Sequence, residues 1–284
     1  MHSPSFSFEL FPPRTPESAA KLPGVIRELA AVGPAYFSVT HGACGSGQDG
    51  TYETILSVIE TAGVEAAPHL TCIGSTRANI AEALGRYRAA GVKRIVALRG
   101  DLPATAMSAS APGEFHYANE LVSFIRETHG DWFTIEVAAY PEMHPQAPNP
   151  TADFDNFRRK VEAGANGAIT QLFYNAEVYC DFVERCQKAG LDIPVMPGIM
   201  PITGYANTLR FCTSCGADLP RWIRLRLEEL QEDKPALLDF GLSVVARLSE
   251  TLLRNGAPGL HFYTINQSEP TLRLWSSLGL NVTA

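Results

Sequence analysis

The chain has 284 residues, which is enough for two average domains or for one large α/β barrel. Hydrophobic residues make up 45% and charged residues 19%, so the sequence supports a large core and carries no signature of disorder. The net charge of −7 argues against a general binder of nucleic acid or of anionic membranes, because phosphate groups need a basic surface. No apolar run approaches about 18 residues and no signal peptide is evident, so we expect a soluble, cytoplasmic protein.

The six cysteines are too few for a disulfide scaffold in a chain of this length. Cys212 and Cys215 form the only close pair, and no second such pair or histidine pair stands at the spacing of a zinc site. We expect both to be reduced, structural thiols. His69 and His144 also lack an evident third ligand, so we expect no metal.

Apolar, β-rich runs recur along the whole chain. Most are continuously apolar, as expected for parallel strands buried on both faces. The eight expected strands are Phe6–Phe11, Tyr36–Thr40, Ala66–Cys72, Arg94–Arg99, Phe133–Tyr140, Ala168–Phe173, Pro194–Met200 and Leu260–Ile265.

Amphipathic helical patterns separate these runs, for example Tyr52, Ile55, Leu56 and Ile59 at i, i+3, i+4 and i+7. A glycine suited to a helix C-terminus precedes each strand from the second to the eighth: Gly33, Gly63, Gly91, Gly130, Gly164, Gly190 and Gly256. The alternation predicts an α/β protein, a (β/α)8 TIM barrel in which residues 1–284 form one domain. A doubly wound sheet is the alternative, but no GxGxxG fingerprint follows the first strand.

In a barrel the active site lies where the strands end, so polar residues there become candidates. Long connections at 102–116, 142–150 and 203–235 follow strands and are expected on the same face. The strand-end candidates are Glu9, Thr40, His41, His69, Arg99, Asp101, Tyr140, His144, Gln171, Tyr263 and Asn266.

Glu9 interrupts an apolar run. A carboxyl that points into a barrel favours its neutral form, which would make Glu9 a proton donor near neutral pH. The alternative is a structural ion pair with an arginine such as Arg14.

A second set of candidates lies at the start of an expected helix. Asp153, Asn156, Arg159 and Lys160 share roughly one face, and backbone donors at a helix N-terminus attract phosphate. The alternative is an ordinary solvated helix face.

Together these segments resemble the 5,10-methylenetetrahydrofolate reductase family of flavoproteins, in a bacterial-type chain that matches the catalytic domain only. The matching stretches run in order along the whole chain. They include Phe-Glu-Leu-Phe-Pro-Pro-Arg-Thr (8–15), Ser-Val-Thr-His-Gly-Ala (38–43), Ala-Pro-His-Leu-Thr-Cys (67–72), Ala-Leu-Arg-Gly-Asp-Leu-Pro (97–103), Ala-Ala-Tyr-Pro-Glu-Met-His-Pro (138–145), Ile-Thr-Gln-Leu-Phe (169–173), Pro-Gly-Ile-Met-Pro (197–201) and His-Phe-Tyr-Thr-Ile-Asn (261–266).

The resemblance implies a barrel that holds FAD, which NADH or NADPH reduces. Ping-pong hydride transfer would then convert methylenetetrahydrofolate to 5-methyltetrahydrofolate, in one-carbon metabolism and methionine biosynthesis. It implies Glu9 as general acid and Asp101 as a carboxylate beside the flavin and the folate. It also implies small-molecule partners in a homo-oligomer, with no nucleic acid and no membrane.

The resemblance assigns further site residues by position. The implied FAD contacts are His41, His69, Arg99, Gly100, Asp101, Ala118, Tyr140, His144, Ala147, Asp153, Asn156, Arg159 and Lys160. The implied substrate contacts are Thr40, Asp101, Gln171, Tyr205 and Gln267.

Two of these positions depart from the family pattern. Tyr205 stands where a Phe is expected, and Gln267 where bacterial relatives often carry Arg. One alternative function is another barrel enzyme without flavin, such as a metal-assisted aldolase. The second alternative is a non-catalytic folate-binding barrel, in which Glu9 would be part of a structural ion pair.

Overall fold

The computed structural model describes residues 4–41, 47–100 and 113–280. Its strands form one sheet in which every pairing is parallel, in the order β7-β6-β5-β4-β3-β2-β1-β9-β8. The strands are β1 Ser5–Leu10, β2 Tyr36–Val39, β3 Glu65–Thr71, β4 Arg94–Leu98, β5 Thr134–Ala139, β6 Gly167–Thr170, β7 Val195–Met196, β8 Gly198–Ile199 and β9 Gly259–Tyr263.

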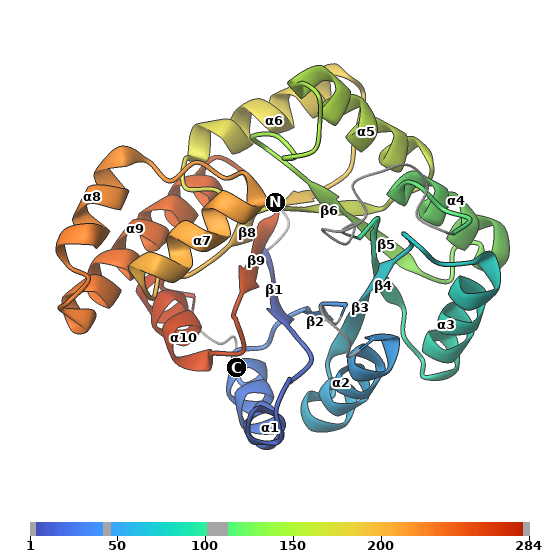
Figure 1. Cartoon of the computed structure of the whole chain (residues 1–284), viewed down its shortest axis with the longest axis horizontal. Helices are drawn as coiled ribbons and strands as arrows, with labels where there is room; N and C mark the ends of the chain where they lie inside the picture. The colour runs from blue at the N-terminus through green and yellow to red at the C-terminus, as the bar shows by residue number, and fades with distance from the viewer. Residues whose placement is uncertain (1–3, 42–46, 101–112, 281–284) are drawn as a thin grey trace.

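The two ends of the sheet meet at a single run of chain. Val195 of β7 pairs with β6, and Gly198 of β8 pairs with β9. Pro197 separates the two short strands because it has no N–H for a ladder, although its carbonyl accepts a hydrogen bond from His261. The single strand predicted at Pro194–Met200 is therefore divided. The sheet is a nearly closed barrel (Figure 1), and the predicted TIM-barrel fold is confirmed.

Helices surround the barrel (Figure 1). They are α1 Pro16–Ala30, α2 Gly47–Ala62, α3 Arg77–Ala89, α4 Ala118–His129, α5 Pro150–Glu162, α6 Ala176–Lys188, α7 Tyr205–Cys215, α8 Arg221–Glu229, α9 Lys234–Arg254 and α10 Ser268–Ser277. The segment 203–235, predicted as a long connection with extra turns, contains α7 and α8. Among the described residues, no helix is both long and apolar enough to cross a membrane.

The helix boundaries follow local chemistry. Thr15 caps α1 in a capping box with Ser18, and Asn149 caps α5 just before Pro150. All seven glycines expected at helix ends have positive φ, for example 71° at Gly33, a conformation that costs glycine little.

The two faces of the barrel strands differ in chemistry. Phe8 and Leu10 of β1 belong to the large apolar core that includes residues of the surrounding helices. The interior holds a smaller apolar cluster of Tyr36, Ala67, Val96 and Ile169. Ser7, Ser38 and His261 are fully buried, and the His261 ring hydrogen-bonds to both serine hydroxyls. The barrel interior therefore contains a polar network that apolar strand patterns do not reveal.

Candidate active site

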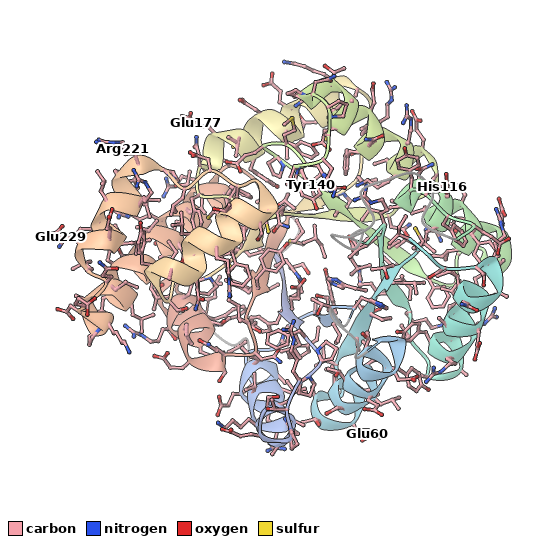
Figure 2. The ribbon with its side chains drawn as sticks, in the orientation of Figure 1. Glu60, His116, Tyr140, Glu177, Arg221 and Glu229 are labelled. Atoms are coloured by element: carbon pink, nitrogen blue, oxygen red, sulfur yellow. The ribbon has the colours of Figure 1, made fainter. Side chains whose placement is uncertain are left out.

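A cavity of about 900 Å³ opens at the carboxyl ends of the strands, the expected place for a barrel active site. Among the predicted residues, Glu9, Thr40, His69, Tyr140, Gln171 and Tyr263 line it. Figure 2 shows Tyr140 near the middle of the ring of helices, whereas His116 and Glu177 lie toward the outside. The structure thus brings strand-end residues from six strands to one cavity.

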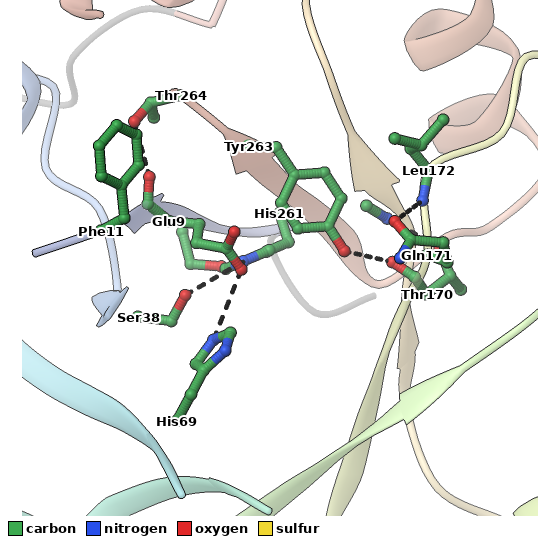
Figure 3. A network of polar contacts seen from close by, with 12 residues as sticks. Glu9, Phe11, Ser38, His69, Thr170, Gln171, Leu172, His261, Tyr263 and Thr264 are labelled. Atoms are coloured by element: carbon green, nitrogen blue, oxygen red, sulfur yellow. Dashed lines mark hydrogen bonds and ion pairs between the residues drawn. The ribbon is translucent and has the colours of Figure 1, made fainter. Parts of the chain in front are cut away.

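Glu9 is placed by the register of β1, opposite Ser38 of β2 and Tyr263 of β9. Its Oε2 atom lies 3.4 Å from Nε2 of His69 and 3.7 Å from Nε2 of His261 (Figure 3). Within the described part of the chain, no Lys or Arg lies within ion-pair distance of this carboxyl group. The alternative pairing with Arg14 is therefore not observed.

His69 forms the wall beside Glu9. Its Nε2 atom is buried and has no hydrogen-bond partner among the described residues. Burial lowers the pKa of His69 to about 4, more than Glu9 raises it. A neutral imidazole therefore faces the carboxyl group at pH 7.

Two further polar side chains of the cavity are held by backbone groups (Figure 3). The Tyr263 hydroxyl donates to the Thr170 carbonyl at 2.5 Å, and burial raises the pKa of Tyr263 well above its ordinary value. The side-chain oxygen of Gln171 accepts a hydrogen bond from the amide of Leu172 at 2.8 Å. These contacts fix the side chains before any ligand binds.

The candidate face of α5 lies against β5 and the segment that follows it. Lys160 Nζ donates to the Ala138 carbonyl at 2.5 Å, and burial lowers the pKa of Lys160 to about 8, although Asp153 opposes the shift. Asp153 accepts from the amide of His144 at 3.0 Å. Arg159 donates to Asn156 at 3.0 Å. The four residues therefore share a face, and Lys160 packs inward rather than into solvent.

Other predicted residues extend the site from two loops. Arg99 donates to Gln146 at 2.5 Å and to the Gly100 carbonyl at 3.1 Å, so the segment after β4 contacts the segment after β5. His144 packs edge-on against Tyr140, and the amide of Ala147 donates to the carbonyl of His144.

The remaining predicted residues lie elsewhere. His41 follows β2, where burial lowers its pKa, and Ala118 begins α4. Tyr205 begins α7 and Gln267 is the exposed N-cap of α10; neither lines the cavity. Asp101 lies outside the described residues.

Helix α7 supplies cavity residues that sequence reasoning missed: Arg210, Phe211, Ser214 and Cys215. They stand at i, i+1, i+4 and i+5, which is one face of a helix, and that spacing was the available signal. Cys212, one turn before the end of this helix, is buried in the core instead. Cys212 therefore lies in the core and Cys215 at the cavity. The described residues contain no cluster of three or more His, Cys, Asp or Glu side chains that could hold a metal ion.

A barrel of parallel strands with an acidic residue in a cavity at the carboxyl ends is the architecture of an α/β-barrel enzyme. Residues 1–279 match the family model described as methylenetetrahydrofolate reductase. The 5,10-methylenetetrahydrofolate reductase of Salmonella typhimurium is 40% identical over 274 residues, which cover 96% of this chain and 90% of that protein. That of Escherichia coli is 38% identical over the same coverage. The chain belongs to the methylenetetrahydrofolate reductase family, so the resemblance seen in its motifs is confirmed.

One further relative is a longer plant protein, and one solved structure shares the fold. Methylenetetrahydrofolate reductase (NADH) 1 of Arabidopsis thaliana is 34% identical over 286 residues, covering 97% of this chain but 48% of that protein. An uncharacterized Clostridium thermocellum protein, described as binding two copies of 5-methyl-5,6,7,8-tetrahydrofolic acid, shares the fold with a TM-score of 0.67 at 16% identity, covering 98% of this chain and 94% of that one. Family membership makes the chain a flavin-dependent oxidoreductase that reduces 5,10-methylenetetrahydrofolate.

Proposed function

We propose that this enzyme binds FAD, takes reducing equivalents from NADH or NADPH, and forms 5-methyltetrahydrofolate in a ping-pong reaction with Glu9 as the general acid. The observation that carries the proposal is the position of the Glu9 carboxyl group. It lines the cavity beside a neutral imidazole, and no cation among the described residues pairs with it. A carboxyl group in that setting is suited to giving a proton to a ligand.

The residues present suit FAD. The buried Lys160 ammonium donates to the Ala138 carbonyl, which is a neutral acceptor, so an anionic group nearby would find a favourable charge. The N-terminus of α5 offers backbone donors to phosphate oxygens. The buried Nε2 atom of His69 also has no hydrogen-bond partner among the described residues. FAD, when bound, supplies the carrier that accepts a hydride from NAD(P)H and delivers it to the folate.

Glu9 would act on the folate ring. In methylenetetrahydrofolate the one-carbon unit bridges two nitrogens, and it accepts a hydride only after one C–N bond breaks. Glu9 gives its proton to the leaving nitrogen as that bond breaks, so the electron pair of the bond stays with this nitrogen. The other nitrogen holds the resulting iminium carbon, which the hydride converts to a methyl group. Glu9 is left as a carboxylate and must regain a proton before the next turnover.

Other residues orient the ligands in this proposal. Thr40 and Gln171 line the cavity and offer polar groups to the nicotinamide or the folate. Asp101 would place a negative charge near the cationic iminium intermediate, which favours its formation. The roles of His41, Arg99, Gly100, Ala118, Tyr140, His144, Ala147, Asp153, Asn156, Arg159, Tyr205 and Gln267, a homo-oligomeric state and a cytoplasmic location stay predictions.

The test is a pair of half-reactions on the purified protein loaded with FAD. We expect NADH or NADPH to bleach the flavin absorbance, and methylenetetrahydrofolate to restore it with formation of 5-methyltetrahydrofolate. A protein that takes up no FAD would contradict the cofactor assignment. A protein that binds folate without turnover would instead be the non-catalytic binding barrel.

A further inference from the structure

A network of buried polar side chains lies next to Glu9 in the barrel interior. His261 of β9 places Nδ1 2.7 Å from the Ser7 hydroxyl and Nε2 3.3 Å from the Ser38 hydroxyl. The same Nε2 atom lies 3.7 Å from Oε2 of Glu9. Ser7 is in turn the side-chain hydrogen-bond partner of Tyr36. These side-chain contacts therefore connect β2, β1 and β9 with the Glu9 carboxyl group at the cavity.

His261 has no route to a ligand. It is 0% exposed and is not among the residues that line the cavity. Ser7 and Ser38 are also fully buried. His261 therefore acts on the reaction only through side chains that reach the cavity: Glu9, whose carboxyl group faces Nε2, and Tyr263, whose ring packs edge-on against the imidazole.

His261 lies between two hydroxyl groups, and its tautomer decides which ring nitrogen donates a hydrogen bond. With the ring proton on Nε2, Nδ1 accepts the hydroxyl proton of Ser7, and Nε2–H faces Ser38 and Glu9. With the ring proton on Nδ1, the imidazole donates to Ser7 and Nε2 is an acceptor.

We propose that His261 is a positioning residue for Glu9: its Nε2–H holds the Glu9 carboxyl group in place and receives the carboxylate that remains after proton transfer. The proposal rests on the role of Glu9 in the proposed function. The gap of 3.7 Å is longer than a hydrogen bond, and such catalytic contacts often tighten only when the ligand binds. His261 gives up no proton in this role, so the balance of the reaction is unchanged.

Two substitutions of His261 distinguish the contact made by Nε2 from the contact made by Nδ1. The Gln amide occupies roughly the position of Nε2, whereas the shorter Asn amide occupies roughly that of Nδ1. His261→Gln therefore keeps a donor toward Glu9, and His261→Asn keeps only the contact with Ser7. We expect His261→Asn to slow the folate half-reaction about 10- to 100-fold, the effect of one lost hydrogen bond to a charged group, and His261→Gln to restore most of that rate. Reduction of FAD by NADH or NADPH should match the wild type in both, as it should in His129→Asn, a control on α4.

The pH profile of the folate half-reaction adds a readout that a merely structural role would not move. Titratable groups face His261 or Glu9 from several strands: Tyr36 on β2, His69 on β3, Glu136 on β5 and Tyr263 on β9. These groups remain in both variants, so a profile that shifts in His261→Asn and returns in His261→Gln reports the lost Nε2 contact.

Failure of this inference and failure of the proposed function have different signatures. Full folate activity in Glu9→Gln would overturn the proposed function. Loss of the folate step in Glu9→Gln but not in His261→Asn would overturn the inference alone. Equal loss of both half-reactions in both His261 variants, with a lower melting temperature, would also overturn it. If the variants do not fold, ¹⁵N shifts of His261 in the wild-type holoenzyme decide: a proton on Nε2 supports the proposal, and one on Nδ1 overturns it.

Discussion

Glu9 and Glu136 both belong to barrel strands and both are largely buried, yet their surroundings differ. Glu136 of β5 accepts from Arg94 at 2.5 Å, and Arg94 also approaches Glu65 at 3.3 Å. Glu9 of β1, at the cavity, faces two imidazoles at 3.4 and 3.7 Å. A carboxyl group held by a guanidinium is committed to that ion pair, whereas one at a cavity beside a neutral imidazole is available to exchange a proton with a ligand.

A glycine on the neighbouring strand leaves space for the buried Glu136 carboxyl group. Gly167 lies opposite Glu136 on β6, and a Cβ atom there would collide with the Glu136 carboxyl group. Burial raises the pKa of Glu136, and Arg94 lowers it. The ion pair therefore offsets part of the desolvation of Glu136.

The largest expected effect is on Glu9. Glu9→Gln removes the proton donor and should slow the folate half-reaction about 10²- to 10⁴-fold, the usual contribution of general acid catalysis. Flavin reduction should stay near the wild-type rate, because that step needs no acid at the folate. Stopped-flow absorbance measures both steps. Equal loss in both halves together with a lower melting temperature would assign Glu9 a structural role instead.

Glu136 should give the reverse result. Glu136→Gln leaves Arg94 without its nearest charge partner and should reduce the free energy of unfolding by about 3 kcal/mol, as when one member of a buried pair is removed. The folate rate per folded molecule should stay close to wild type. Urea unfolding followed by circular dichroism measures the free energy of unfolding. If Glu136→Gln mainly lowers the folate rate instead, the contrast between Glu9 and Glu136 is wrong.

The next effect depends on pH through His69. Its folded pKa of about 4 lies below the ordinary value of 6.5, so the unfolded chain binds this proton more readily. The resulting stability is present above about pH 6.5 and is lost as the pH falls toward 4, by at most about 3 kcal/mol. His69→Asn should flatten this part of the stability curve. An unchanged slope between pH 6.5 and 4 in the variant would contradict the shift.

The smallest change in stability is expected at Arg14, which the sequence suggested as an ion-pair partner of Glu9. Arg14 is exposed and lines the cavity, and no ion pair joins it to Glu9. Arg14→Gln should change the free energy of unfolding by less than about 0.5 kcal/mol, the usual range for surface positions. A loss as large as that of Glu136→Gln would show that Arg14 does pair with a carboxylate.

Local sequence patterns were enough to predict the repeating architecture of strands and helices. Continuous apolar runs, amphipathic stripes and glycines at helix ends are local properties, so the parallel barrel and most strand positions followed from them. The split of the seventh strand did not, because only the closing of the sheet shows that the chain pairs with β6 before Pro197 and with β9 after it. The sequence also marked Glu9 as exceptional, since a carboxyl group is unexpected within an apolar run.

The surroundings of Glu9, in contrast, depend on contacts between strands that are distant in the sequence. His69 and His261 are 60 and 252 residues away in the chain, and the strand register brings both to the same carboxyl oxygen. The face of α7 in the cavity likewise depends on how that helix packs across the barrel. The register between paired strands decides which inward-facing side chains come into contact. Hydrophobic periodicity shows which side chains face inward, but it does not show which of them are neighbours.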